Sequence, residues 1–315
     1  MKTLLPWKVS DEEQEYLKSN LDDIVIFDPS ELGSMKDSCK LEDFDILIAG
    51  LADERMIDSL VNLKFIQSMI SGVSHIDLEC AEKRGIIVSS TKGANAYSVS
   101  EHAMLLALEL MKNSKTYYEQ VNRNQWQKHY SEDLYGKNIG IIGYGSIGTE
   151  IARRMRSFGV RINAVRKRPQ LGNNGVELDY LGDDLDYVLR NSDIIFITAP
   201  KTQETIDLIN LEKISIMKEG SYLLNVSRGP IVNMQAVSYA LKSHLLAGFA
   251  TDVFDTEPNY FNDDVYSLRN VICTPHVAAY SHNSKIKCLE FVVNNINGFQ
   301  ENKKINNVVD FRLGY

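Results

Sequence analysis

Residues 138–148, Asn-Ile-Gly-Ile-Ile-Gly-Tyr-Gly-Ser-Ile-Gly, decide the fold of this chain. The apolar residues at 139–142 predict a short, buried strand. Apolar side chains then recur at helical spacing over 147–158, and Gly159 stands where a left-handed helix cap is expected. A further apolar run at 160–165 predicts the next strand. The stretch therefore predicts a strand, a glycine turn, a helix and a second strand in close succession.

Three glycines between the first strand and the helix, Gly143, Gly145 and Gly148, have the spacing G-x-G-x-x-G. The first permits a tight turn, the second lets the backbone approach a pyrophosphate, and the third lets the helix pack close to the strand. Free N–H groups at the helix start, including those of Ser146 and Ile147, would face the phosphates with the help of the helix dipole. A glycine turn that binds nothing has no need of three glycines at this spacing, so we predict a dinucleotide site.

The composition is that of an ordinary soluble globular protein. The 315 residues, 44% hydrophobic and 24% charged, are enough for two domains with substantial cores. The net charge of −8 argues against a broad nucleic-acid-binding surface. The sequence has no membrane-spanning run and no signal peptide, and its cysteines lack metal-binding spacing, so we expect a cytoplasmic protein with reduced thiols and no metal. The cysteines are Cys39, Cys80, Cys273 and Cys288, of which Cys273 lies in an apolar run and is expected in the core.

Short apolar runs alternate with polar helical stretches along most of the chain, which predicts parallel sheets with helices on both faces. Over 1–98, strands are expected at 3–5, 24–27, 46–49, 65–68 and 86–89, and helices at 11–21, 54–60 and 76–83. Beyond residue 165, strands are expected at 194–197, 221–225, 247–251 and 271–274, and a return helix at 284–300.

Residues 101–111 are almost all apolar and predict a helix that is buried on most sides and crosses between two domains. Ser98 and Glu101 fit a capping box at its start. The following residues, 113–137, are polar and rich in aromatic side chains. They predict either an arm onto a second subunit or a surface helix and loop.

Arg228, Glu257 and His276 each follow the carboxyl end of an expected strand, where open α/β sheets bind ligands. An arginine there can hold a carboxylate through two parallel hydrogen bonds. On its own, Arg228 is as often a structural or surface residue as a functional one, and a lone glutamate or histidine at such a position is more often an ordinary loop residue. Their shared placement makes the joint functional interpretation stronger than any single one.

Four motifs occur in order along the chain: Gly-Tyr-Gly-Ser-Ile-Gly at 143–148, Asn-Val-Ser-Arg-Gly at 225–229, Asp-Val-Phe-Asp-Thr-Glu-Pro at 252–258 and Thr-Pro-His-Val-Ala at 274–278. Together they resemble the D-isomer-specific 2-hydroxyacid dehydrogenase family. Residues 71–77 also resemble that family's substrate-carboxylate loop, and 95–101 resemble the beginning of its interdomain helix.

The resemblance implies an α/β fold with two doubly wound domains. A Rossmann nucleotide-binding domain, residues 99–283, would be inserted into a flavodoxin-like substrate domain formed by residues 1–98 and 284–315. The resemblance also implies a homodimer built mainly on the nucleotide domains, with a small 2-keto or 2-hydroxy acid as the partner molecule.

The family's catalytic roles fall on Arg228, Glu257 and His276, and the chemistry agrees. Reduction of a 2-keto acid needs a hydride, which the nicotinamide supplies, and a proton, which protonated His276 can donate. Glu257 would orient the imidazole and favour its charged form, and Arg228 would bind the carboxylate and polarise the carbonyl oxygen. The resemblance also implies substrate contacts from the backbone of Ser71, Gly72 and Val73. It implies cofactor contacts from Ala199, Pro200, Thr205, Val226, Ser227 and Asp252, the last to the nicotinamide amide.

The chain departs from the family pattern at three points. It has Arg166 where an acidic residue often ends the second nucleotide-domain strand, Thr198-Ala199-Pro200 where many members have His-x-Pro, and Ile70-Ser71-Gly72 where the carboxylate loop often begins Gly-x-Gly. The first departure concerns cofactor choice. Arg166, Lys167 and Arg168 begin where the adenosine ribose is expected, and a guanidinium binds the 2′-phosphate that a carboxylate would repel.

We therefore predict an NADPH-preferring 2-keto acid reductase that makes the D-2-hydroxy acid, with NADH as a possible cofactor. One alternative is an NAD-dependent member such as a phosphoglycerate dehydrogenase, in which the basic run is only a solvated turn. Another is a non-catalytic dinucleotide-sensing protein that resembles corepressors of this fold. The substrate side chain is left open, and its pocket is expected near 50–52, Tyr97 and Tyr280.

Overall fold

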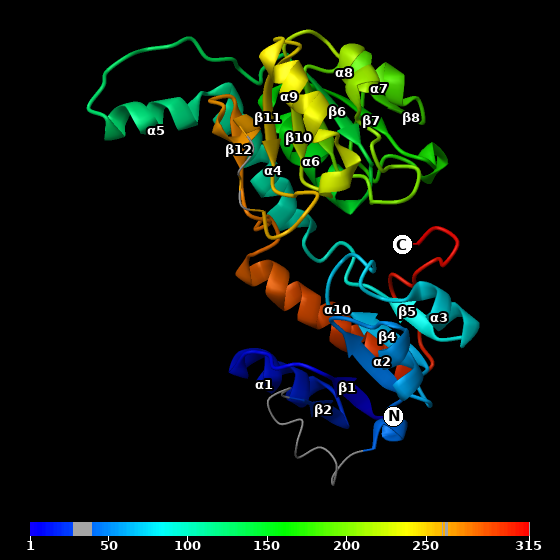
Figure 1. The fold of residues 1–315 in the computed structure, drawn as a ribbon. Coiled ribbons are helices and arrows are strands. Elements are labelled where there is room, and N and C mark those ends of the chain that lie inside the picture. Colours follow the sequence, from blue (N-terminus) through cyan, green and yellow to red (C-terminus); the bar gives the residue numbers. More distant parts are fainter. Residues whose placement is uncertain (28–39, 260, 262–263, 315) are drawn as a thin grey trace. The chain divides into compact units, whose positions relative to one another are not determined.

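The computed structural model describes residues 1–27, 40–259, 261 and 264–314, which divide into two compact units (Figure 1). The first unit consists of residues 1–95 and 282–315, and the second of residues 96–281. Each unit is organised around one sheet of parallel strands with helices on both faces. The predicted α/β fold with two doubly wound sheets is thereby confirmed.

The sheet of the first unit has five strands within the described residues, in the order β2-β1-β3-β4-β5, which is the flavodoxin-like order. The strands are β1 (Thr3–Leu5), β2 (Ile24–Ile26), β3 (Ile46–Ala49), β4 (Phe65–Ser68) and β5 (Ile87–Ser89). The helices are α1 (Asp11–Asn20), the 3-10 turn η3 (Leu41–Asp43), α2 (Glu54–Ser59), α3 (Leu78–Lys83) and α10 (His282–Gln300). Every residue of β3 and β4 is buried, because helices cover both faces of a parallel sheet.

Two hydrophobic cores lie on the two faces of this sheet. On one face Leu17 of α1 and Val292 of α10 pack against β1, β3 and β4, and on the other Ile57 of α2 and Ala81 of α3 do the same. A buried amide, Asn295 of α10, joins the late segment to the early one. Its Nδ2 donates to Gln67 Oε1 at 2.9 Å and to Ser89 Oγ at 3.0 Å. The C-terminal helix is therefore an integral part of the first unit.

The sheet of the second unit has seven strands in the described residues, in the order β12-β11-β10-β9-β6-β7-β8. They are β6 (Asn138–Ile142), β7 (Arg161–Val165), β8 (Tyr180–Gly182), β9 (Ile194–Ile197), β10 (Ser221–Asn225), β11 (Leu246–Thr251) and β12 (Val271–Cys273). The chain order reverses between β6 and β9, and such a switch point is where nucleotides bind in sheets of this kind. The sequence did not predict β8, whose residues Tyr-Leu-Gly are half-buried and form no apolar run.

Helices cover both faces of the second sheet (Figure 1). The helices of this unit are α4 (Ala96–Met111), α5 (Ser114–Asn122), α6 (Ser146–Met155), α7 (Leu185–Asn191), α8 (Leu211–Ser215) and α9 (Met234–Lys242), with 3-10 turns η4 (Arg156–Phe158), η5 (Pro169–Leu171), η6 (Gly229–Ile231) and η7 (Asp264–Ser267). Residues of α4 and α6 pack on one face, and those of α7, α8 and α9 on the other. Gly159 follows η4 with a φ of 70°, so the predicted left-handed cap is confirmed.

The other predicted strands are confirmed to within one residue at each end, and most helices agree nearly as well. The buried helix predicted over 101–111 begins earlier, at Ala96, and Tyr97, Glu101 and Leu105 form its exposed stripe. The predicted capping box was therefore wrong. Ser98 lies inside α4, and its hydroxyl donates to the carbonyl oxygen of Ala278 at 2.7 Å.

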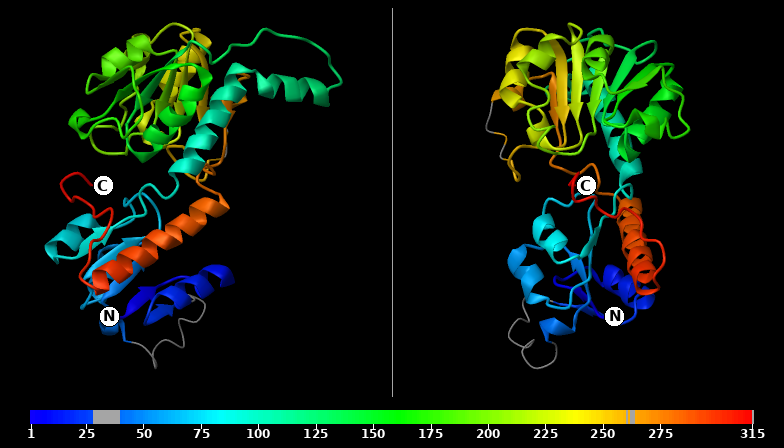
Figure 2. Two further views of the ribbon diagram at one scale, coloured as in Figure 1. Left: turned by 180° about the vertical axis from the view of Figure 1, so that it is seen from behind. Right: turned by 90° about the vertical axis from the view of Figure 1, so that its right-hand side faces the viewer.

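The aromatic segment after α4 forms α5 and then a stretch without regular secondary structure over 123–137. Figure 2 shows it reaching beyond the rest of the second unit. Trp126 is 91% exposed, and Tyr130 and Tyr135 are also exposed. The segment is thus a surface helix and loop, and its role as an arm stays a prediction.

The thiols of Cys80, Cys273 and Cys288 are free, and Cys39 lies outside the described residues. Cys273 packs against a core of the second sheet, and burial raises the pKa of its thiol to about 12. The thiol therefore stays protonated and is a poor nucleophile. Across the described residues, none of the helices has the length and apolarity needed to cross a membrane.

Candidate active site

The glycine turn between β6 and α6 is shaped by two close backbone approaches. Gly143 has a φ of 96°, and a Cβ atom there would lie 2.3 Å from the nitrogen of Ala199. A Cβ atom on Gly148 would lie 2.7 Å from the carbonyl oxygen of Gly143. Gly145 is different, because a Cβ atom there would meet nothing within 4 Å. The first and third glycines are required by packing, and the second leaves an open side at the start of α6.

The loop after β9 is bound to this turn. The Thr198 hydroxyl donates to the Gly143 carbonyl oxygen at 2.6 Å, so the threonine that departs from the family's His-x-Pro pattern helps to hold the turn. The Thr205 hydroxyl donates to the Pro200 carbonyl oxygen at 2.7 Å and keeps the loop compact. The Ser227 hydroxyl donates to the carbonyl oxygen of Ala199. Predicted cofactor contacts from two different loops are therefore tied to one another.

The basic turn after β7 has an acidic neighbour that the sequence did not indicate. Arg166 directly follows the strand, and its Nη1 donates to the Gly172 carbonyl oxygen at 3.3 Å. Lys167 Nζ lies 2.8 and 2.7 Å from the two carboxylate oxygens of Glu204. Counting along the chain finds no acidic residue between Glu150 and Glu177, but Glu204 reaches the basic run from the loop after β9. Both members of this ion pair are exposed, so its contribution to stability is small.

Arg228, Glu257 and His276 follow three strands that are neighbours in the sheet, β10, β11 and β12. Glu257 Oε2 lies 2.6 Å from His276 Nδ1, and Glu257 Oε1 accepts the amide hydrogen of Phe254 at 2.9 Å. A Cβ atom on Gly229 would lie 2.0 Å from the carbonyl carbon of Phe254, so glycine is needed for the loops after β10 and β11 to meet.

The guanidinium of Arg228 is largely unused by the protein. Burial lowers its pKa and the charge of Glu257 raises it, and an arginine remains charged in any case. Its Nη1 donates to the Ser227 carbonyl oxygen at 2.6 Å, the one hydrogen bond from this side chain in the described residues. A guanidinium has five N–H donors, so most of them remain available for a ligand.

The imidazole of His276 has a fixed orientation. Because Nδ1 faces a carboxylate, the hydrogen on Nδ1 is donated to Glu257 and Nε2 is the nitrogen left to exchange a proton. His276 itself has a φ of 53°, a left-handed conformation that costs a residue of this kind about 1–3 kcal/mol. Such a conformation persists only where surrounding contacts impose it.

Asp252 supplies those contacts. Its side chain is 1% exposed, and its two oxygens accept from the Thr274 hydroxyl at 2.6 Å and from the amides of Val277 and Ala278 at 2.9 and 2.8 Å. Sequence reasoning assigned Asp252 to the nicotinamide amide and missed its bonds to the loop of His276. The signal was present, since an acidic residue at the end of a buried strand must find hydrogen-bond donors.

In the first unit, the loop after β4 presents unused backbone donors. The amides of Ser71, Gly72 and Val73 donate to no acceptor within the described parts of the chain. The hydroxyl of Ser68 donates to the Ile70 carbonyl oxygen at 2.9 Å and holds the start of this loop. Three consecutive free amides can bind an anion, as the predicted carboxylate contact requires.

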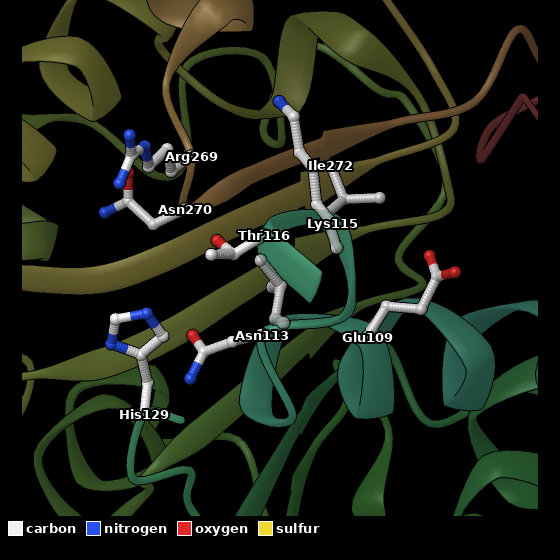
Figure 3. A pocket seen from close by; sticks show the side chains of 9 residues that line it. Glu109, Asn113, Lys115, Thr116, His129, Arg269, Asn270 and Ile272 are labelled. Carbon is white, nitrogen blue, oxygen red and sulfur yellow. The ribbon is translucent and has the colours of Figure 1, made fainter. Parts of the chain in front are cut away.

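A pocket of about 270 Å³ lies elsewhere in the second unit, where α4 and α5 meet the start of β12 (Figure 3). Lys115 lines it and donates to the carbonyl oxygens of Leu268 and Val271 at 2.9 and 3.1 Å, which fastens the base of α5 to the sheet. The pocket is at the amino end of β12, whereas His276 follows the carboxyl end. It therefore contains none of the residues predicted for catalysis.

Comparison with known proteins gives matches that belong to one group of dehydrogenases and reductases. The family model described as "D-isomer specific 2-hydroxyacid dehydrogenase, NAD binding domain" matches residues 104–278. A glyoxylate reductase of Pyrococcus furiosus is 32% identical over 83% of this chain and 81% of its own length. A D-3-phosphoglycerate dehydrogenase of Archaeoglobus fulgidus is 30% identical over 98% of this chain and 59% of its own length. The crystal structure of D-lactate dehydrogenase from Aquifex aeolicus with NAD and lactic acid is similar with a TM-score of 0.78 and 28% identity, covering 98% of this chain and 99% of that one.

The glycine turn gives a matched pair of variants. Gly143→Ala should lower the melting temperature strongly, because its methyl group would collide with backbone and its φ disfavours alanine. Gly145→Ala should melt close to the wild type, because its methyl group meets no atom, yet should bind nicotinamide dinucleotide more weakly. Thermal melting and fluorescence titration with NADPH measure both effects. Equal melting temperatures for the two variants would contradict this account of the turn.

Proposed function

Because the chain belongs to the D-isomer specific 2-hydroxyacid dehydrogenase family, we propose that it reduces a small 2-keto acid to the D-2-hydroxy acid with NADPH. The observation that carries the proposal is the 2.6 Å contact between Glu257 and His276, which follow β11 and β12, the two strands on one side of the strand β10 that precedes Arg228. The chain is a nicotinamide-dependent oxidoreductase, and these residues supply what such a reduction needs besides the hydride.

The proton comes from His276. The bound nicotinamide supplies a hydride to the carbonyl carbon. His276, charged before the reaction, gives its Nε2 proton to the carbonyl oxygen, which becomes the hydroxyl group. Glu257 accepts the Nδ1 hydrogen throughout, so it stabilises the charged imidazole before transfer and keeps the ring oriented afterwards.

The substrate carboxylate is assigned to Arg228. Its free N–H donors can form two parallel bonds to a carboxylate, and its positive charge stabilises the negative charge that develops on the carbonyl oxygen. Partial burial strengthens both interactions, because less water screens them. The free amides of Ser71, Gly72 and Val73 are proposed as further carboxylate donors, with the first unit as the substrate domain and the second as the nucleotide domain.

The proposed preference for NADPH rests on the charges after β7. No carboxylate stands at the end of that strand to bind a ribose 2′-hydroxyl, and Arg166 presents a guanidinium in its place. Lys167 is already paired with Glu204, so it contributes less to binding a 2′-phosphate than its position suggests. We therefore assign Arg166 the main contact to the phosphate.

A phosphoglycerate dehydrogenase is the second candidate, since a relative with that name aligns over 98% of this chain. It would use the same reaction on a substrate with an added phosphate. The homodimer and the cytoplasmic location also stay predictions. Exposed aromatic residues after α5, such as Trp126 and Tyr130, support a contact with a second copy. The mass of the protein in solution decides between monomer and dimer.

The reaction is tested by following NADPH oxidation with glyoxylate, hydroxypyruvate, phosphohydroxypyruvate and pyruvate. We expect turnover of an unphosphorylated 2-keto acid, and chiral analysis should find the D-isomer with any substrate that gives a chiral product. Arg228→Lys keeps the charge and loses the planar fork, so kcat/KM should fall about ten- to a hundredfold. Binding of dinucleotide without turnover of any 2-keto acid would reject the proposal, and wild-type kcat/KM in Arg228→Lys would reject the role of that residue.

The proton donor is tested by the pH dependence of reduction. The rate should decline as pH rises, because His276 loses the proton that it must donate. In Glu257→Gln the decline should occur at lower pH, since the charged imidazole has lost its carboxylate partner. His276→Ala should retain dinucleotide binding and lose about a hundred- to ten-thousandfold in kcat. An unshifted profile in Glu257→Gln would show that its charge does not act on the acid.

Cofactor choice is tested with Arg166→Asp, Glu204→Gln and, as a control, the same charge reversal at the other end of β7, Arg161→Asp. Arg166→Asp should weaken NADPH binding by about a hundredfold and NADH binding little. Glu204→Gln should strengthen NADPH binding, because it frees Lys167 for the phosphate. The control should leave the ratio of the two affinities unchanged. Comparable wild-type kcat/KM for NADH and NADPH would refute the preference.

A further inference from the structure

We propose that Ser98 and His102, one turn apart on α4, form a clamp that positions the proposed acid, His276. His102 Nε2 lies 2.8 Å from the Thr274 hydroxyl oxygen, and the Ser98 hydroxyl donates to the Ala278 carbonyl oxygen at 2.7 Å. These contacts hold the two ends of the loop 274–278. The inference rests on the proposed function, and it makes both residues positioning residues, since neither is assigned a contact with substrate.

The hydrogen bonds in this clamp run in one direction. The Thr274 hydroxyl donates its single hydrogen to Asp252 Oδ1, 2.6 Å away. The same hydroxyl oxygen can then only accept from His102. His102 therefore carries a hydrogen on Nε2 and donates it to the Thr274 hydroxyl oxygen. Through Thr274, α4 is connected to the carboxylate of Asp252.

The loop 274–278 needs contacts from other elements to keep its conformation. His276 is held at a φ of 53°, and the loop contains Pro275, which has no amide hydrogen to donate. Asp252, which follows β11, binds the loop, and α4 also binds it through Ser98 and through His102, whose Nε2 lies 3.7 Å from Asp252 Oδ1. A loop fastened from two elements has less freedom to move His276 away from Glu257.

Losing the clamp should affect the acid more than the fold or the cofactor. Most of α4 is fixed by its buried apolar residues, which do not depend on His102. The glycine turn is fixed by other contacts, those of Gly143 with Ala199 and Thr198. Within the described residues, Glu257 is the charged group in contact with His276, and the charge of Arg228 interacts with that of Glu257. The carboxylate of Asp252 binds the amide of Val277, the next residue of the loop, and lies 3.7 Å from His102 Nε2. A displaced loop weakens the bond to Glu257 and makes protonated His276 less stable.

The test compares His102→Ala with His102→Gln, whose side-chain amide can still donate to Thr274. Glu101→Gln is the matched control, since it changes the neighbouring, exposed residue of α4. In His102→Ala, kcat for 2-keto acid reduction should fall about ten- to a hundredfold, with the affinity for NADPH unchanged. The decline of the rate with pH should also move to lower pH. His102→Gln and Glu101→Gln should behave like the wild type.

Two results would overturn the clamp: a wild-type kcat and pH profile in His102→Ala, or an equal loss in His102→Gln. If His102→Ala does not fold, Ser98→Ala removes the other end, and an unchanged kcat and pH profile there overturns the proposal. NMR titration of the His276 imidazole needs no turnover, and the removal of either end should move its protonation to lower pH. A wild-type protein without reductase activity would reject the proposed function, while an unmoved NMR titration would reject the clamp alone.

Discussion

The buried carboxylate of Asp252 is the interaction on which the shape of the candidate site depends. It stands at the end of β11, where burial obliges it to find hydrogen-bond donors, and it takes them from Thr274, Val277 and Ala278. These bonds hold the loop in a conformation that its histidine would not otherwise adopt. The contact of that histidine with Glu257 follows from them. The buried carboxylate at the end of β11 thus sets the orientation of His276, which follows the neighbouring strand β12.

Close backbone approaches allow the loops to meet above the sheet. In a parallel sheet every strand ends at the same edge, so side chains that follow different strands are brought together without any local signal between them. The loops themselves must then fit into limited space. Gly143 and Gly229 make this possible, because any side chain at either position would strike the backbone of a neighbouring loop. Within the glycine motif, packing requires Gly143 and Gly148, whereas a Cβ atom on Gly145 would meet no atom within 4 Å.

The charge at the site proposed for the 2′-phosphate is set by residues that follow two different strands, β7 and β9. The basic run after β7 is evident in the sequence, and its effect on a phosphate would be overestimated if it were considered alone. Glu204, from the loop after β9, pairs with Lys167, while Arg166 donates to the carbonyl oxygen of Gly172. The strength of an exposed ion pair is small, so a phosphate that carries more charge than the carboxylate could compete for Lys167. The net charge of Arg166, Lys167 and Glu204 therefore depends on the folded structure, which brings two separate segments together.

The sequence by itself determined the elements and their order, because apolar periodicity and glycine spacing are local properties of the chain. It therefore predicted both parallel sheets, the glycine turn and the strand ends that carry Arg228, Glu257 and His276. It did not predict β8, whose three residues are too few to leave a periodic signal. Nor did it predict the bonds of Asp252, the ion pair of Glu204 or the true position of Ser98. These depend on which distant donors and acceptors meet when the chain is packed, and only the tertiary structure decides that.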